Sequence, residues 1–182
     1  MKKKTLNIPK LESSEVIHEA YFKVRKESVR YSNEYLHQYH LVEIETPAVI
    51  VLPITIRQTI VVLEEYRHPT KKTLLGPCAG SMDPLETPFE ASERELEEET
   101  GYQASSFELL GTGYPYPGLS GQPFYYVLAI DAEKVKEPTL EPAEVLFSFE
   151  IDKEALIKRL LNEDNVDVNL SVAFAYYLLR KR

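Results

Sequence analysis

The chain has 182 residues, which fits a domain with a buried core, and 43% hydrophobic with 27% charged residues is ordinary globular usage. A formal net charge of −8 leaves no basic excess for a nucleic-acid backbone or an anionic membrane surface, so neither partner is expected. The single cysteine, Cys78, excludes an internal disulfide. Because no apolar run has the length and flanks of a signal peptide or a membrane span, we expect a cytoplasmic protein.

The first half of the sequence has the apolar and polar alternation of strands. In chain order, the expected strands cover residues 15–29, 35–45, 48–54 and 59–64. We expect a turn near Ser32 and Asn33 in the first pair. The second pair is rich in β-branched residues and flanks Arg57 and Gln58, which predicts a hairpin of buried strands.

A capping box predicts a helix that begins at Pro88. Thr87 can accept a hydrogen bond from the Glu90 amide while the Glu90 side chain reaches back, and proline suits the first helical position. Gly101 stands where a left-handed C-cap is needed, so the helix has about 13 residues.

The second half predicts further strands and two closing helices. The expected strands cover residues 107–110, 123–130 and 145–151, and the expected helices cover residues 152–162 and 171–180. The order of elements indicates an α+β fold, with strands around a central helix.

Three carboxylates share one face of the central helix. With Glu95 as the reference, Glu98 and Glu99 lie at roughly −60° and +40° around the helix axis. Like charges at this spacing repel, and carboxylate oxygens are the ligands that Mg²⁺ or Mn²⁺ prefers. The helix alone leaves two interpretations open, a solvated acidic surface or a divalent-cation site that also holds a phosphate.

The wider spacing matches a long motif. The fixed positions are Gly80, Glu86, Arg94, Glu95, Leu96, Glu98, Glu99 and Gly101. This pattern resembles the Nudix box, G-x5-E-x7-R-E-U-x-E-E-x-G-U, with Tyr102 at a place where an aliphatic residue or tryptophan is commoner. The resemblance implies that Glu95, Glu98 and Glu99 bind Mg²⁺, with Mn²⁺ as a possible substitute, assisted by the Ala79 carbonyl. It also implies that Arg94 orients these carboxylates and that Glu86 either pairs with Arg94 or supports the residues around the metal ligands.

The resemblance extends to one branch of the family, the ADP-ribose and nucleoside diphosphate sugar pyrophosphatases. Residues 65–69 resemble its Q-Y-R-x-P motif, and residues 116–118 resemble its S-P-G motif. The branch implies a Nudix fold in which mixed β-sheets are sandwiched between α-helices, with an N-terminal β-strand extension. Residues 1–45 would form that extension and residues 46–182 the hydrolase domain. Relatives in this branch form homodimers with swapped N-terminal strands, so we expect a homodimer.

The branch also implies substrate and base residues. Arg67 is expected to bind the diphosphate, because its planar fork matches phosphate oxygens, with an ordinary surface arginine as the alternative. Pro117 and Gly118 would line the sugar side. The loop before residue 145 carries Glu141 and Glu144, where the branch keeps a general base and a further metal ligand. We favour Glu141 as the base with Glu144 next, and ordinary exposed loop glutamates are the alternative.

The expected activity is Mg²⁺-dependent hydrolysis of a nucleoside diphosphate sugar to a nucleoside monophosphate and a sugar phosphate. Gly76 replaces a glutamate that is usual in the branch, and Gln122 stands where an acid is frequent. The substrate range therefore stays open between ADP-ribose, GDP-mannose and similar ADP-, GDP- or UDP-sugars. A non-catalytic sensor or scaffold of the same fold that binds a nucleotide sugar is the alternative function.

Overall fold

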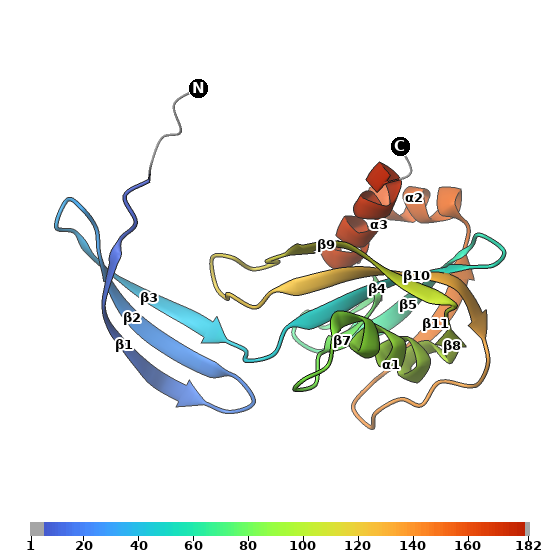
Figure 1. Ribbon diagram of the computed structural model, residues 1–182, viewed down its shortest axis with the longest axis horizontal. Helices are drawn as coiled ribbons and strands as arrows, with labels where there is room; N and C mark the ends of the chain where they lie inside the picture. Colours follow the sequence, from blue (N-terminus) through green and yellow to red (C-terminus); the bar gives the residue numbers. More distant parts are fainter. Residues whose placement is uncertain (1–5, 181–182) are drawn as a thin grey trace. The chain divides into compact units, whose positions relative to one another are not determined.

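The computed structural model describes residues 6–180, and its chain divides into two compact units (Figure 1). The first unit holds the described residues up to Glu45 together with Tyr114–Gln122. The second holds Thr46–Gly113 and the described residues from Pro123 onward.

The first unit is built on an antiparallel sheet in the order β1-β2-β3. Its strands are β1 (Lys10–Glu19), β2 (Lys23–Arg30) and β3 (Leu36–Glu43). The turn expected near Ser32 is present, with Glu34 at a φ of 62°. The stretch 15–29, however, is interrupted at residues 20–22, where the Ala20 amide donates to the Phe22 carbonyl at 2.9 Å. No glycine, proline or asparagine marks that turn, so sequence reasoning missed it.

The second unit contains an eight-stranded mixed sheet with the central order β11-β5-β4-β10-β8. Its strands are β4 (Ala48–Thr55), β5 (Ile60–Arg67), β6 (Lys72–Gly76), β7 (Cys78–Ser81), β8 (Tyr102–Gln103), β9 (Ser106–Gly113), β10 (Phe124–Lys134) and β11 (Leu146–Ile151). Strand β6 pairs with β5, β7 with β4, and β9 with β10. Strands β4 and β10 run parallel, whereas their other pairings are antiparallel.

Helices cover both faces of this sheet. Helix α1 (Pro88–Thr100) packs on one face, and α2 (Lys153–Asn162) and α3 (Val168–Arg180) pack on the other (Figure 1). Alternate residues of β4 enter two separate cores: Val51 joins Leu96 of α1, whereas Leu52 joins Phe174 of α3. Complete burial of Leu96 contributes about 2 kcal/mol, which holds α1 against the sheet.

The central helix has the expected boundaries. The Glu90 amide donates to Thr87 Oγ1 at 3.3 Å, and the Thr87 amide donates to Glu90 Oε2 at 2.8 Å. Gly101 adopts a φ of 74° and donates its amide to the Glu97 carbonyl. The acidic face is therefore fixed at both ends.

Two differences from the expected elements have local causes. Helix α3 begins at Val168 rather than at residue 171, because Asp167 Oδ1 accepts from the Asn169 amide at 2.8 Å and caps it. Strands β6 and β7 are short and separated by Pro77, so they lack a strand pattern. In the part of the chain that the structure describes, no helix is long and apolar enough to cross a membrane.

Candidate active site

The acidic face of α1 lies against strand β7, and Glu99 is its most deeply buried carboxylate. The Ala79 amide donates to Glu99 Oε2 at 2.9 Å, and Glu99 is only 4% exposed. Burial raises the pKa of Glu99 to about 8, against opposing hydrogen bonds from the Cys78 thiol and the Ala79 amide. A carboxyl group in this setting is held mostly protonated at neutral pH unless a cation joins it.

Glu95 lies directly on the backbone of Gly80. A Cβ atom at position 80 would stand 1.9 Å from Glu95 Oε1, so a larger residue would displace this carboxylate from its place against the backbone. Glu95 is 9% exposed, and burial raises its pKa while the hydrogen bond from Arg94 lowers it. The motif glycine therefore keeps the Glu95 carboxylate in this position by allowing its close approach, and not through a special backbone conformation.

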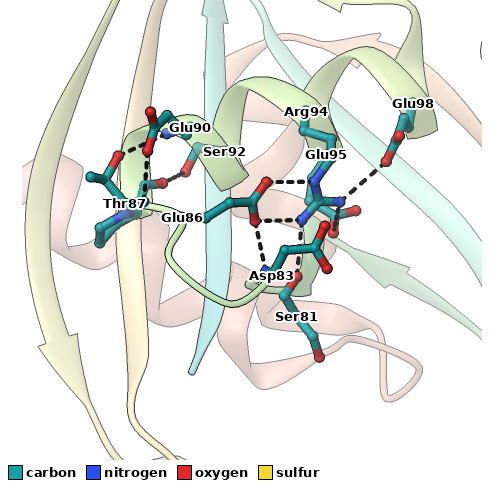
Figure 2. Close-up of polar contacts among 10 residues, drawn as sticks. Ser81, Asp83, Glu86, Thr87, Glu90, Ser92, Arg94, Glu95 and Glu98 are labelled. Carbon is teal, nitrogen blue, oxygen red and sulfur yellow. Dashed lines mark hydrogen bonds and ion pairs between the residues drawn. The ribbon is translucent and has the colours of Figure 1, made fainter. Parts of the chain in front are cut away.

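Arg94 gathers the polar groups around the helix (Figure 2). Its Nε and Nη2 each donate to the Glu86 carboxylate at 2.9 Å, so Glu86 pairs with Arg94 through a forked contact. Its Nη1 donates to Glu95 Oε1 at 2.7 Å and to Glu98 Oε2 at 3.2 Å, and its Nη2 also donates to the Ser81 carbonyl at 3.0 Å. Arg94 thus links two of the three predicted metal ligands to the loop before α1.

These residues have the donor chemistry to hold a divalent cation. Glu95, Glu98 and Glu99 supply hard oxygen donors, and Arg94 is the cation that contacts the first two of them. Buried Glu99 has an amide and a thiol for partners, so its ionised form still needs a positive charge. Within residues 6–180, no three His, Cys, Asp or Glu side chains are already gathered so that they could hold a metal ion.

Arg67 ends strand β5 beside a carboxylate that sequence reasoning did not single out. Its Nη2 lies 2.8 Å from Glu65 Oε2, and the Glu65 side chain is 13% exposed against 42% for Arg67. Burial raises the pKa of Glu65, and the Arg67 charge lowers it. The sequence could have indicated this pair, because side chains two residues apart on a strand lie on the same face. Arg67 is therefore oriented by Glu65 and remains accessible to an anion.

The loop before β11 brings Glu141 and Glu144 together. The Glu144 amide donates to the Glu141 carbonyl at 3.0 Å, and the Glu141 amide donates to Glu144 Oε2 at 2.7 Å. Burial raises the pKa of Glu95 and of Glu65, and the negative charge of Glu144 adds to both increases. These interactions favour Glu144, more than Glu141, as the loop carboxylate that faces the acidic helix.

Pro117 and Gly118 belong to the first unit, in Tyr114–Gln122. There the Leu119 amide donates to the Tyr116 carbonyl at 2.8 Å, and the Val42 amide donates to the Leu119 carbonyl at 2.8 Å. This loop is thereby attached to strand β3. Its expected role on the sugar side stays a prediction.

The chain is similar in sequence to a known family and to two characterised proteins. A family model described as the NUDIX domain matches residues 45–167. The chain is 28% identical over 135 residues to an ADP-ribose pyrophosphatase of Bacillus subtilis (strain 168) and 29% identical over 135 residues to a methanol dehydrogenase activator of Bacillus methanolicus. Each of these alignments covers 74% of this chain and 73% of the relative.

A solved structure described as an ADP compounds hydrolase superposes with a TM-score of 0.84 at 25% sequence identity. The superposition covers 98% of this chain and 96% of that one. These findings confirm the family resemblance and the fold that the motif predicted, with mixed strands between helices.

Proposed function

The chain belongs to the NUDIX domain family and is a Nudix hydrolase, and from that premise we propose that it cleaves the diphosphate of nucleoside diphosphate sugars with Mg²⁺. The observation that carries the proposal is the combination of the buried Glu99 carboxylate on α1, whose hydrogen-bond partners are an amide and a thiol, with the accessible guanidinium of Arg67. The carboxylate suits a divalent cation, and the guanidinium suits a phosphate oxygen.

In this proposal Glu95, Glu98 and Glu99 hold the cation, with the Ala79 carbonyl as a further oxygen donor. Arg94 orients Glu95 and Glu98, while Glu86 fixes Arg94 through its forked contact. A bound Mg²⁺ would neutralise charge on the phosphoryl oxygens and make water more acidic.

The remaining roles fall to the chain's own polar groups. Arg67 binds the diphosphate through its planar fork, and Glu65 holds that fork in place. Glu144 accepts the proton of the attacking water, with Glu141 as the second candidate. The water oxygen bonds to phosphorus and the bridging P–O bond breaks, so a nucleoside monophosphate and a sugar phosphate leave.

ADP-ribose is the first substrate to test, because one relative is named an ADP-ribose pyrophosphatase and a structural neighbour is named an ADP compounds hydrolase. GDP-mannose and UDP-sugars follow, since Gly76 removes an acidic side chain that the branch usually carries. Pro117 and Gly118 stay the predicted sugar-side residues through their motif.

We also propose a homodimer formed through the N-terminal strands, in the cytoplasm as the sequence predicts. Strand β1 is exposed along its whole length and carries exposed Leu11, Val16 and Ile17. Apolar side chains on an edge strand favour pairing with a second chain. Light scattering after size-exclusion chromatography tests this, and a monomer at micromolar concentration would refute it.

The experiment for the activity is a substrate panel with product identification. ADP-ribose, GDP-mannose and UDP-glucose are incubated with Mg²⁺, Mn²⁺ or a chelator, using wild type, E98Q and the matched control E93Q. Glu93 is exposed on the other side of α1. We expect metal-dependent cleavage that E98Q lowers by about 100-fold or more and E93Q leaves unchanged. Binding without cleavage of any sugar would instead favour the non-catalytic sensor.

A further inference from the structure

The segment between β10 and β11 is tied to the C-terminal end of helix α1. The Thr139 amide donates to the Glu98 carbonyl at 2.8 Å, and the Val135 and Lys136 amides donate to the Gly101 carbonyl at 2.9 and 3.2 Å. The last carbonyls of a helix lack partners within the helix, so these bonds satisfy them. We call residues 135–139 the strap.

Side-chain contacts and a close approach reinforce these bonds. Lys136 Nζ lies 2.5 Å from Glu97 Oε1, on the side of α1 away from the sheet. At Gly101, a Cβ atom would stand 2.0 Å from the Lys136 carbonyl oxygen. Gly101 therefore both caps the helix and allows the close approach of the strap, because any larger residue would push the strap away.

The strap has little else to hold it. Between Glu133 and Val145 no residue is buried, so apolar packing contributes little to the position of this segment. Its far end is held by a backbone bond from the Tyr66 amide to the Val145 carbonyl at 2.9 Å. Polar contacts to α1 and β5 therefore decide where the intervening residues lie.

Those intervening residues include Glu144. The strap ends two residues before Glu141, whose amide holds the Glu144 carboxylate at 2.7 Å. The same end of the strap is bonded to Glu98, because the Thr139 amide donates to the Glu98 carbonyl, and the Glu98 side chain is a proposed metal ligand. One short path of bonds thus connects the proposed metal-binding face with the proposed base.

We propose that Lys136 and the Thr139 amide are positioning groups, which set the distance between the Glu144 carboxylate and the metal-binding face of α1. The proposal rests on the proposed function. Displacement of a reacting group by about 1 Å can lower a rate by about 100-fold, so a contact remote from the reacting atoms can control kcat. Because the bonds of the strap go to backbone carbonyls of Glu98 and Gly101 and to the Glu97 side chain, its loss should lower kcat and leave KM for the nucleotide sugar nearly unchanged.

The test compares charge reversal with a matched pair on the same segment. K136E, E97K and the K136E/E97K swap alter the strap contact, whereas K134E alters Lys134, which pairs with Glu137 at 3.1 Å on the segment itself. T139P removes the amide donor, and T139A keeps it. Each variant is assayed for kcat and KM with ADP-ribose and Mg²⁺, for thermal unfolding, and for hydrogen exchange of residues 138–144.

We expect K136E and E97K each to lower kcat by about three- to tenfold, the scale of one partly exposed ion pair whose sign is reversed. The swap should restore kcat and slow exchange, while K134E should change neither. T139P should lower kcat by about tenfold or more relative to T139A, with Tm as the check on folding.

Unchanged kcat in K136E and T139P with faster exchange of residues 138–144 would overturn the positioning role. A swap that fails to restore kcat would do the same. If wild type cleaves no diphosphate sugar while exchange still responds to K136E, the proposed function has failed and the strap is structural only. These two failures are therefore distinguishable by hydrogen exchange, which does not depend on activity.

Discussion

Replacement of Glu99 by glutamine should stabilise the metal-free protein while abolishing its activity. The carboxyl is 4% exposed, and its pKa is raised by burial from an ordinary value of 4.5 to about 8. Glutamine has nearly the same size, stays neutral, and keeps an oxygen that can accept from the Ala79 amide. The substitution therefore removes the cost of ionisation and little else.

The magnitude follows from the two pKa values. Between pH 4.5 and pH 8 the folded protein keeps a proton at Glu99 that the unfolded chain has lost, so stability falls as pH rises. Each pH unit in that window costs about 1.4 kcal/mol, which gives about 3 kcal/mol at pH 7 and about 5 kcal/mol at pH 9. E99Q should recover this amount, and its advantage should vanish near pH 4.5.

The assay is chemical unfolding of wild type and E99Q in the presence of a chelator, at half-unit steps from pH 5 to pH 9. We expect the difference in unfolding free energy to grow with pH and level off above pH 8. Adding Mg²⁺ should stabilise wild type alone, because ligand binding to the folded state raises its stability. Equal stability of the two proteins at pH 8, or a less stable E99Q, would refute the interpretation of a buried carboxyl that awaits a cation.

The other predictions concern single contacts. G80A places a Cβ 1.9 Å from Glu95 Oε1, so Mg²⁺ affinity by titration calorimetry should fall by about tenfold or more, and unchanged affinity would contradict the close-approach argument. Y102F removes the hydrogen bond from the Tyr102 hydroxyl to Glu150 Oε1 at 2.9 Å; unfolding should become easier by about 1 kcal/mol while kcat stays within about twofold. R67K keeps the charge and loses the fork, so KM should rise by about tenfold with a smaller change in kcat, and an unchanged KM would exclude Arg67 as a diphosphate ligand.

The central helix was predictable because its signals are local. Thr87, Pro88, Glu90 and Gly101 specify its ends through contacts within a few residues, and the structure forms each of them. The same spacing places Glu95 and Glu99 on the face toward β7. Local rules were sufficient here because capping and helical periodicity depend little on the rest of the chain.

The contacts between distant segments were not predictable in this way. The Glu65 partner of Arg67, the Thr139 bond to Glu98 and the Tyr102 bond to Glu150 depend on how strands pair and where loops return. Tyr102 shows the limit well: it stands where the motif more often has an aliphatic residue or tryptophan, and it is buried, but its hydroxyl donates to a carboxylate 48 residues away. Sequence spacing carries no information about such a partner.

The most direct test of the account is cleavage of ADP-ribose in oxygen-18-labelled water, with Mg²⁺, by wild type and E98Q. The account predicts equal amounts of AMP and ribose 5-phosphate from wild type, oxygen-18 in one phosphate product, and almost no product from E98Q or with a chelator. Products that form at the wild-type rate in E98Q, or intact ADP-ribose after incubation with wild type and Mg²⁺, would contradict it.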